Sequence, residues 1–310
     1  MRVLLTSWAS FARGEATAGD VRAVRAVSDA LSESGVCHDT AWSPGFLPGE
    51  LHVDDAPPSR YSHLVFACGP VHGWQIRELH ERYSACRRIA VGVSVPDPND
   101  PAATGFHRVL PRDDAASGGA VSGGAVSGDA ASRRAVAAGA DLSLAAPCER
   151  RPVVGVTLAL GQPEYGRAGR HDVVHEALTA WLRRTDVDRV PLDTRLATDD
   201  WRHCATPDQF GSVPAAMDAV VSTRLHRLVL GLAAGVPVLA VDPVAGGGKV
   251  TAQARVLGWP VVGAGDVHDH AGLSRALEWC LSDGARTRVT EAVRSARACV
   301  PTGRLLAEIA

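Results

Sequence analysis

The residues best suited to chemistry lie in one stretch of the chain. Arg224 and His226 come directly after a short apolar run, 219–222, and before a longer apolar stretch with helical spacing. A strand-to-helix turn leaves backbone N–H groups free at the positive end of the helix dipole, and both favour an anion. Arginine adds a planar fork that grips a carboxylate or phosphate through two hydrogen bonds. Histidine adds a group that moves a proton near neutral pH, so the segment predicts an anion site with acid–base capacity.

A second cation follows in the next expected loop. Lys249 is the only lysine of the chain, and three glycines at 246–248 precede it. Because glycine lets the backbone approach a ligand closely, Lys249 is expected to form a second clamp on the same anion. The stretch is not a P-loop, since Val250 stands where that motif has Ser or Thr.

Each of these residues also has a structural interpretation. Lys249 fits an exposed loop charge, and His226 fits a structural histidine in a mostly buried first helical turn. The anion that meets Arg224 can be an internal carboxylate such as Asp242 rather than a ligand.

Short apolar strands alternate with longer helical stretches, which is typical of parallel sheets with crossover helices. Strands are predicted at 2–7, 63–68, 88–93, 153–160, 187–191, 219–222, 236–241 and 260–262. Helices are predicted at 21–34, 74–84, 130–138, 171–184, 207–217, 225–234, 250–257, 270–282 and 285–299. Glycines follow several strand ends, where open α/β sheets bind ligands.

The chain of 310 residues is long enough for two domains of roughly 150 residues each. A polar joint at 149–152 predicts domains 1–150 and 151–310. Residues 117–132 contain the repeat SGGAV-SGGAV and predict a mobile low-complexity insert. The expected fold is α/β, with two Rossmann-like domains facing across a cleft in which a ligand binds.

Composition excludes several classes of partner. The formal net charge of −2 gives no overall positive field for nucleic acid or an acidic membrane. Seven scattered cysteines without a CxxC pair indicate reduced thiols, and the histidines at 171, 175, 268 and 270 lack a metalloenzyme pattern, so no metal is expected. No apolar run approaches the roughly 20 residues of a membrane span or forms a signal peptide, so a cytoplasmic protein is expected.

Residues 222–241, STRLHRLVLGLAAGVPVLAV, with a lysine in the next loop, resemble the R-L-H segment of the polysaccharide pyruvyl transferase family. Other stretches also resemble segments of that family, and they occur in the same order along the chain. Gly19-Asp20 resembles the family's G-D turn, and Ala67-Cys68-Gly69 resembles its glycine turn after a strand. Arg112-Asp113 with Ser117 resembles its R-D-x-x-S segment, lengthened here by one residue. The glycine-rich turns of the first half are sparser than in that family.

This resemblance implies a GT-B-like fold and transfer of the pyruvyl group of phosphoenolpyruvate onto a sugar hydroxyl pair as a ketal. Phosphoenolpyruvate is then the donor co-substrate, no separate cofactor is needed, and the other partner is a saccharide. The donor is expected on domain 151–310 and the acceptor on domain 1–150. Contact with a membrane is expected only for a lipid-linked acceptor.

The site residues follow from the same resemblance. His226 is the expected acid/base, Asp20 is expected to orient an acceptor hydroxyl, and the residues expected to bind phosphoenolpyruvate are Arg224, Leu225, Lys249 and Arg112. Asp20 also fits an N-cap of a helix that begins at Val21. Arg112 also fits a surface group paired with Asp113 and Asp114.

Two other functions stay open. A GT-B nucleotide-sugar glycosyltransferase shares the architecture but usually has an acidic ribose ligand, and 222–240 contains no Glu. A catalytically idle member that only binds an anionic sugar or a partner protein is the second.

Overall fold

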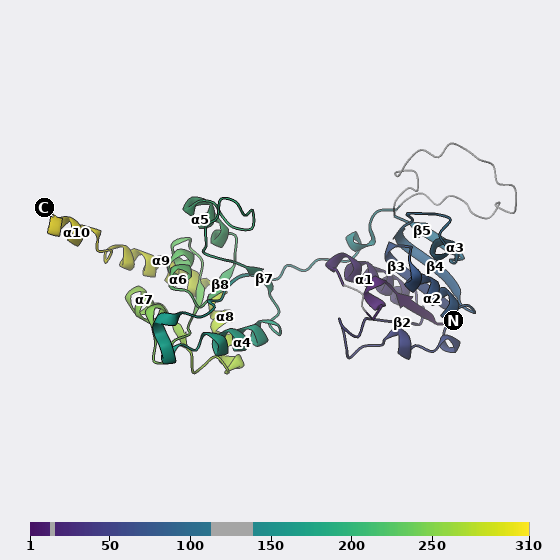
Figure 1. The fold of residues 1–310 in the computed structure, drawn as a ribbon, viewed down its shortest axis with the longest axis horizontal. Coiled ribbons are helices and arrows are strands. Elements are labelled where there is room, and N and C mark those ends of the chain that lie inside the picture. The colour runs from purple at the N-terminus through teal and green to yellow at the C-terminus, as the bar shows by residue number, and fades with distance from the viewer. Residues whose placement is uncertain (13–15, 113–138, 310) are drawn as a thin grey trace. The chain divides into compact units, whose positions relative to one another are not determined.

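The computed structural model describes residues 1–12, 16–112 and 139–309. The chain divides into two compact units, Met1–Cys148 and Glu149–Ala310 (Figure 1). The expected insert at 117–132 and the expected helix at 130–138 lie outside the described residues.

The first unit is a parallel sheet flanked by helices. Its strands are β1 (Val3–Thr6), β2 (His38–Thr40), β3 (His63–Pro70), β4 (Arg87–Ser94) and β5 (Arg108–Pro111), in the order β2-β1-β3-β4-β5. Its helices are α1 (Ala18–Glu33), α2 (Trp74–Arg82) and α3 (Pro101–Thr104), with the 3₁₀ turns η1 (Trp8–Ser10), η2 (Val53–Asp55), η3 (Pro58–Arg60) and η6 (Leu142–Leu144). The sequence did not predict β2 and β5, because both are short and only half-buried and so lack an apolar run.

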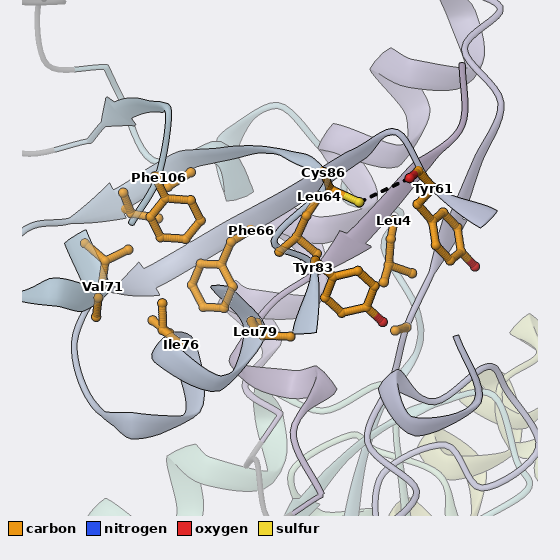
Figure 2. Close-up of a cluster of buried hydrophobic side chains, with 14 of the residues drawn as sticks. Leu4, Tyr61, Leu64, Phe66, Val71, Ile76, Leu79, Tyr83, Cys86 and Phe106 are labelled. Carbon is orange, nitrogen blue, oxygen red and sulfur yellow. Dashed lines mark hydrogen bonds between the residues drawn. The ribbon is translucent and has the colours of Figure 1, made fainter. Parts of the chain in front are cut away.

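Packing of α2 on β3 forms the main core of this unit (Figure 2). Phe66 of β3 is fully buried, and its ring lies 6.2 Å from that of Phe106. Tyr83, just past α2, is also fully buried and donates its hydroxyl to the Ala56 carbonyl at 2.8 Å. Cys86 donates to the Tyr61 carbonyl at 3.1 Å, the dashed contact in Figure 2. These contacts tie the chain just past α2 to the segment that precedes β3.

The second unit repeats this plan. Its strands are β6 (Val153–Thr157), β7 (Asp188–Pro191), β8 (Ala219–Ser222), β9 (Val238–Asp242) and β10 (Val261–Gly263), in the order β10-β9-β8-β6-β7. Its helices are α4 (His171–Leu182), α5 (Pro207–Ala215), α6 (Leu225–Ala233), α7 (Lys249–Leu257), α8 (His270–Cys280), α9 (Asp283–Arg297) and α10 (Thr302–Ile309), with the 3₁₀ segment η7 (Pro163–Ala168). Helix α10 was not predicted from the sequence.

The two sheets have the same strand order, in which the first strand of each unit pairs with both the second and the third. In open α/β sheets of this order, the crevice for ligands opens at the carboxyl ends of those first and third strands. These are β1 and β3 in the first unit, and β6 and β8 in the second. The prediction of two Rossmann-like α/β domains is confirmed. Within the described part of the chain, no helix has both the length and the apolar composition needed to cross a membrane.

Candidate functional site

The start of α6 is an uncapped helix N-terminus at the crevice of the second sheet. Arg224 is its N-cap residue and forms no side-chain cap, and the first turn contains no acidic residue. Thr223 ties this turn to the end of β6, because its hydroxyl accepts a hydrogen bond from the Ala159 N–H at 2.6 Å. The first N–H groups of α6 are therefore placed at the carboxyl edge of the sheet, between β6 and β8, where an anion is favoured.

Arg224 has only loose partners. Its Nη1 donates to the Thr194 hydroxyl at 3.3 Å and lies 3.8 Å from a carboxylate oxygen of Asp193. Its Nε is buried and has no hydrogen-bond partner in the described structure. The side chain is 38% exposed, so the ion pair with Asp193 contributes little to stability. The guanidinium is therefore available to a ligand.

Asp242 is not the partner of Arg224, which corrects one alternative from the sequence. This carboxylate is fully buried and accepts hydrogen bonds from the backbone N–H groups of Val244, Gly248 and Thr251, at 3.0, 2.7 and 2.7 Å. Burial alone raises the pKa of the carboxyl, but a hydrogen bond from the Thr251 side chain and these backbone hydrogen bonds together outweigh it and hold the pKa below its ordinary value. Asp242 thus fixes the loop that ends at Lys249.

Lys249 is the first residue of α7 rather than a loop residue. Its Nζ lies 3.3 Å from the Glu164 carboxylate and 5.8 Å from the centre of the Tyr165 ring. Its backbone N–H donates to the Tyr165 hydroxyl at 3.4 Å. Both partners belong to η7, which follows β6, so Lys249 stands at the same edge of the sheet as Arg224. With Lys249 40% and Glu164 56% exposed, the pair is weak and can exchange for a ligand.

Leu225 and His226 occupy the first two positions of α6. The Leu225 side chain packs against the apolar cluster that includes Leu228 and Leu232, so only its backbone N–H can serve an anion. The His226 side chain is exposed, and the interpretation of His226 as part of a buried turn is wrong. An exposed imidazole beside a helix N-terminus can exchange protons with a ligand held there.

The sequence analysis missed Arg227, the third residue of α6. This arginine is fully buried, and Nε, Nη1 and Nη2 all lack a hydrogen-bond partner among the described residues. Its guanidinium lies 5.0 Å from the centre of the Phe210 ring of α5. Burial lowers the pKa of Arg227 to about 10. The signal in the sequence was the spacing, because an arginine three residues after Arg224 lies on the same side of the helix.

In the first unit the structure joins Asp20 and Arg112 through Cys68. Helix α1 begins at Ala18 and Thr17 is its N-cap, so the prediction of Asp20 as N-cap is wrong. Asp20 lies in the first turn instead, where its carboxylate accepts from the Thr17 hydroxyl at 2.7 Å and from the Cys68 thiol at 3.3 Å. Arg112 Nη1 lies 3.8 Å from the same sulfur.

Further partners hold Arg112 within its own unit. Its Nε donates to the Ser94 hydroxyl at 3.1 Å, and its Nη1 donates to the Asp141 carboxylate at 2.9 Å. The residues once expected to pair with it, Asp113 and Asp114, lie outside the described residues. Arg112 therefore needs no external anion to be paired, although its side chain is partly exposed.

Cys68 sits at a strained point of this cluster. It adopts φ +67°, a left-handed conformation that side chains other than glycine rarely take. Burial, and then the hydrogen bond to Asp20, raise the pKa of the thiol to about 11. Cys68 lies near the carboxyl end of β3, beside the crevice of the first sheet.

Cys68 is therefore expected to resist alkylation. At pH 8, iodoacetamide should modify it about 100-fold more slowly than the exposed Cys148, because only the thiolate reacts. Peptide mass spectrometry over a time course measures both rates in one sample. The variant Asp20→Asn should speed labelling of Cys68 by removing the charge that disfavours the thiolate. Equal rates at Cys68 and Cys148 in the wild-type protein would contradict this assignment.

A groove of about 670 Å³ lies in the first unit between η1, η2 and α2. Its walls include the indole rings of Trp8 and Trp74 and the charged side chains of Asp54, Glu78 and Arg82. Trp8 belongs to the turn after β1, and α2 follows β3, so one end of the groove meets the crevice of this sheet. Aromatic faces beside hydrogen-bonding groups suit a ligand with both apolar and hydroxyl surfaces.

Of the histidines considered for a metal, His171 has protein partners. His171 is buried, hydrogen-bonds to Gln162 at 3.3 Å and stacks on Tyr165 with ring centres 6.3 Å apart. Within the described ranges, no three His, Cys, Asp or Glu side chains gather in a way that could hold a metal ion.

Comparison with known proteins gives similarities of fold. No protein-family model and no curated protein matches the chain. Among solved structures it is similar to the spinosyn rhamnosyltransferase SpnG complexed with thymidine diphosphate, with 12% identity, 96% of each chain covered and a TM-score of 0.33. It is similar to the calicheamicin glycosyltransferase at 14% identity, over 99% of this chain and 97% of that one, with a TM-score of 0.31. It is also similar to the E. coli heptosyltransferase WaaC with ADP at 14% identity, over 90% of this chain and 100% of that one, with a TM-score of 0.25. These likenesses concern the fold alone.

Proposed function

We propose that the protein is a transferase acting on sugars and that the second unit binds the phosphate of its donor at the start of α6. The observation that carries this proposal is the uncapped N-terminus of α6 at the crevice of the sheet, headed by the loosely paired Arg224. Free N–H groups, the helix dipole and a guanidinium all favour a phosphate there.

The donor proposed first is phosphoenolpyruvate, which the R-L-H segment suggests. This molecule carries a phosphate and a carboxylate on a three-carbon frame, so its site needs two cationic clamps. Arg224 and Lys249 follow the neighbouring strands β8 and β9. Each forms a weak ion pair that a ligand can replace. The N–H of Leu225 adds a donor to the phosphate.

Pyruvyl transfer requires a proton donor and groups that stabilise the leaving phosphate. A proton adds to the methylene carbon of phosphoenolpyruvate, and C2 becomes electrophilic. Two sugar hydroxyls lose their protons and form bonds to C2, while the C2–O bond to phosphate breaks and phosphate leaves. One of the two protons balances the proton added to the methylene carbon, and the other leaves on the phosphate. His226 is the proposed acid/base, because its exposed imidazole stands at the second position of α6. The helix N-terminus and Lys249 stabilise the phosphate as it departs.

The first unit is proposed to take the saccharide acceptor in the groove beside Trp8 and Trp74, where sugar faces stack on the indole rings. Asp20, at the crevice of that sheet, orients an acceptor hydroxyl. Arg112 is proposed as a further anion contact. Both residues would have to exchange an internal partner for the ligand, Thr17 or Cys68 for Asp20 and Asp141 for Arg112.

A nucleotide sugar is the second candidate donor. The observation that favours it is the pair Glu164 and Tyr165 beside Lys249. A carboxylate can accept hydrogen bonds from ribose hydroxyls, and a partly exposed ring can stack on a base. The diphosphate would then lie at the same α6 N-terminus, so the two candidates share one site and differ in what surrounds it.

Calorimetric titration separates the candidates. Phosphoenolpyruvate and then UDP-, GDP- and TDP-sugars are titrated into the wild-type protein, Arg224→Ala and the control Arg255→Ala, whose side chain is exposed on α7. Phosphoenolpyruvate is expected to bind, and Arg224→Ala should weaken it by about 2 kcal/mol, or about 30-fold, with no change in the control. Binding of a nucleotide sugar alone makes the protein a glycosyltransferase, and binding of neither contradicts the donor site.

The role of His226 is tested on the reaction. With an acceptor found by screening saccharides for phosphate release, His226→Ala is expected to lower kcat by about 100-fold while the Kd for the donor changes little. Loss of donor binding without a separate loss in kcat would make His226 a binding residue instead.

A further inference from the structure

The environment of Arg227 is unusual for an arginine. The residue is fully buried, and none of its three guanidinium nitrogens has a hydrogen-bond partner among the described residues. Buried charges in proteins are normally paired, because removing a charge from water without a counter-charge is costly. The Phe210 ring offers a cation–π contact, which uses a face of the guanidinium and leaves its N–H groups unsatisfied. An anion is the missing partner.

Arg227 and Arg224 belong to one side of the same helix end. They are three residues apart, and side chains on a helix lean towards its N-terminus, so Arg227 leans over the turn that Arg224 heads. The Nε of Arg224 is likewise buried without a partner in the described structure. Two arginines with unsatisfied guanidinium nitrogens and the free N–H groups of α6 therefore belong to the same helix end.

Both arginines have neighbours in one largely exposed segment, residues 193–206. Arg224 reaches Thr194 and Asp193 at its beginning, while Cys204 near its end lies within electrostatic range of Arg227. The bridge between Leu196 and Cys204 and a contact of 3.9 Å between His203 and Asp193 close the segment, and Trp201 at its tip is 92% exposed. Because this segment is largely exposed, it can lift from α6 at little cost compared with a core element.

We propose that Arg227 is an anion-binding residue and that it forms, with Arg224 and the N-terminus of α6, a site for a dianionic phosphate group that is reached when segment 193–206 lifts. A dianion needs two cationic partners, and two arginine forks supply them with a geometry that matches phosphate oxygens. The inference rests on the proposed function in taking the phosphate to be that of the donor.

Inorganic phosphate is the probe, because it carries the proposed charge and nothing else. Its binding to the full chain is measured by calorimetry, and by the rise in Tm with phosphate concentration, at constant ionic strength. The variants are Arg227→Met, which keeps most of the side-chain volume without charge, and Arg227→Lys, which keeps the charge without the fork. Arg255→Met is the matched control, an exposed arginine of α7. Unfolding curves without phosphate verify that each variant folds.

Phosphate is expected to bind the wild-type protein and Arg255→Met equally, and Arg227→Met at least 10-fold more weakly, with Arg227→Lys between them. Without phosphate, Arg227→Met should unfold at the same or a higher temperature, since it removes an unpaired buried charge. Equal phosphate affinity of the wild type and Arg227→Met overturns the inference, as does a wild-type protein that binds no phosphate.

Failure of this site and failure of the proposed function give different results. Phosphate bound through Arg227, with neither phosphoenolpyruvate nor a nucleotide sugar binding, supports the site and rejects the proposed donors. Phosphoenolpyruvate that binds the wild type and Arg227→Met alike, but not Arg224→Ala, supports the donor and rejects the role of Arg227.

Discussion

Asp242→Ala is expected to lower the free energy of unfolding by about 3 kcal/mol or more, because it leaves three backbone N–H groups without their acceptor. The carboxylate is fully buried and holds Val244, Gly248 and Thr251 at 2.7–3.0 Å. These bonds shape the loop from β9 to α7 and so position Lys249. Urea unfolding measures the loss of stability, and titration with phosphoenolpyruvate should show weakened binding as well.

The same carboxylate predicts the pH dependence of stability. The pKa of Asp242 is held below its ordinary value in the folded protein. The contribution of this carboxylate to the free energy of unfolding is therefore fully present at pH values above the pKa of Asp242 in the unfolded chain, and it is lost as the pH falls through the pKa of the folded state. The isosteric variant Asp242→Asn should lose this acid-dependent contribution and be less destabilised than Asp242→Ala.

Asp188→Ala is the control, since that side chain is exposed on β7 and its loss should change stability by less than about 0.5 kcal/mol. If Asp242→Ala unfolds at the same urea concentration as this control, Asp242 does not organise the loop.

Gly231→Ala is expected to destabilise the protein by about 2 kcal/mol, although alanine is the better helix former. A Cβ at Gly231 of α6 would lie 2.6 Å from a methyl carbon of Val238 on β9. Valine is stiff about its first side-chain bond, so α6 itself has to move. Because the anion site is the start of α6, the variant should also weaken donor binding.

A second glycine provides the matched control. Gly211 lies in α5, and a Cβ there meets nothing within 4 Å. Gly211→Ala should therefore raise stability by up to about 1 kcal/mol, the helix-propensity gain of alanine over glycine. Both variants are compared with the wild type by thermal unfolding. Their changes in stability should have opposite signs if α6 packs on β9 as described. A gain in stability for both would mean that the contact with Val238 does not constrain α6.

The sequence predicted the strands that are buried on both faces of the sheet and the helices that have a clear hydrophobic period. The run 219–222 became β8, with four buried residues, and the helix predicted over 225–234 is α6, Leu225–Ala233. Buried parallel strands appear as continuous apolar runs, so β8 was visible without its neighbours. The turn between them, and with it the place of Arg224, followed from those two elements.

Other features depend on contacts between residues distant in the sequence. The edge strands β2 and β5 exist because β1 and β4 offer them backbone partners, and their half-buried residues give no period of their own. The link from Asp20 through Cys68 to Arg112 joins three segments that only the sheet brings together. No spacing within the chain could have indicated it.

For this protein, the sequence by itself determined two α/β Rossmann-like units and an arginine at a helix start, because hydrophobic periods and strand-to-helix turns are local properties. Only the tertiary structure decided the partners of the charges. It paired Asp242 with backbone N–H groups rather than with Arg224, exposed His226, and buried Arg227 with no hydrogen-bond partner among the described residues. Burial and pairing depend on which segments meet in space, and those long-range contacts are not encoded in the spacing of any one stretch.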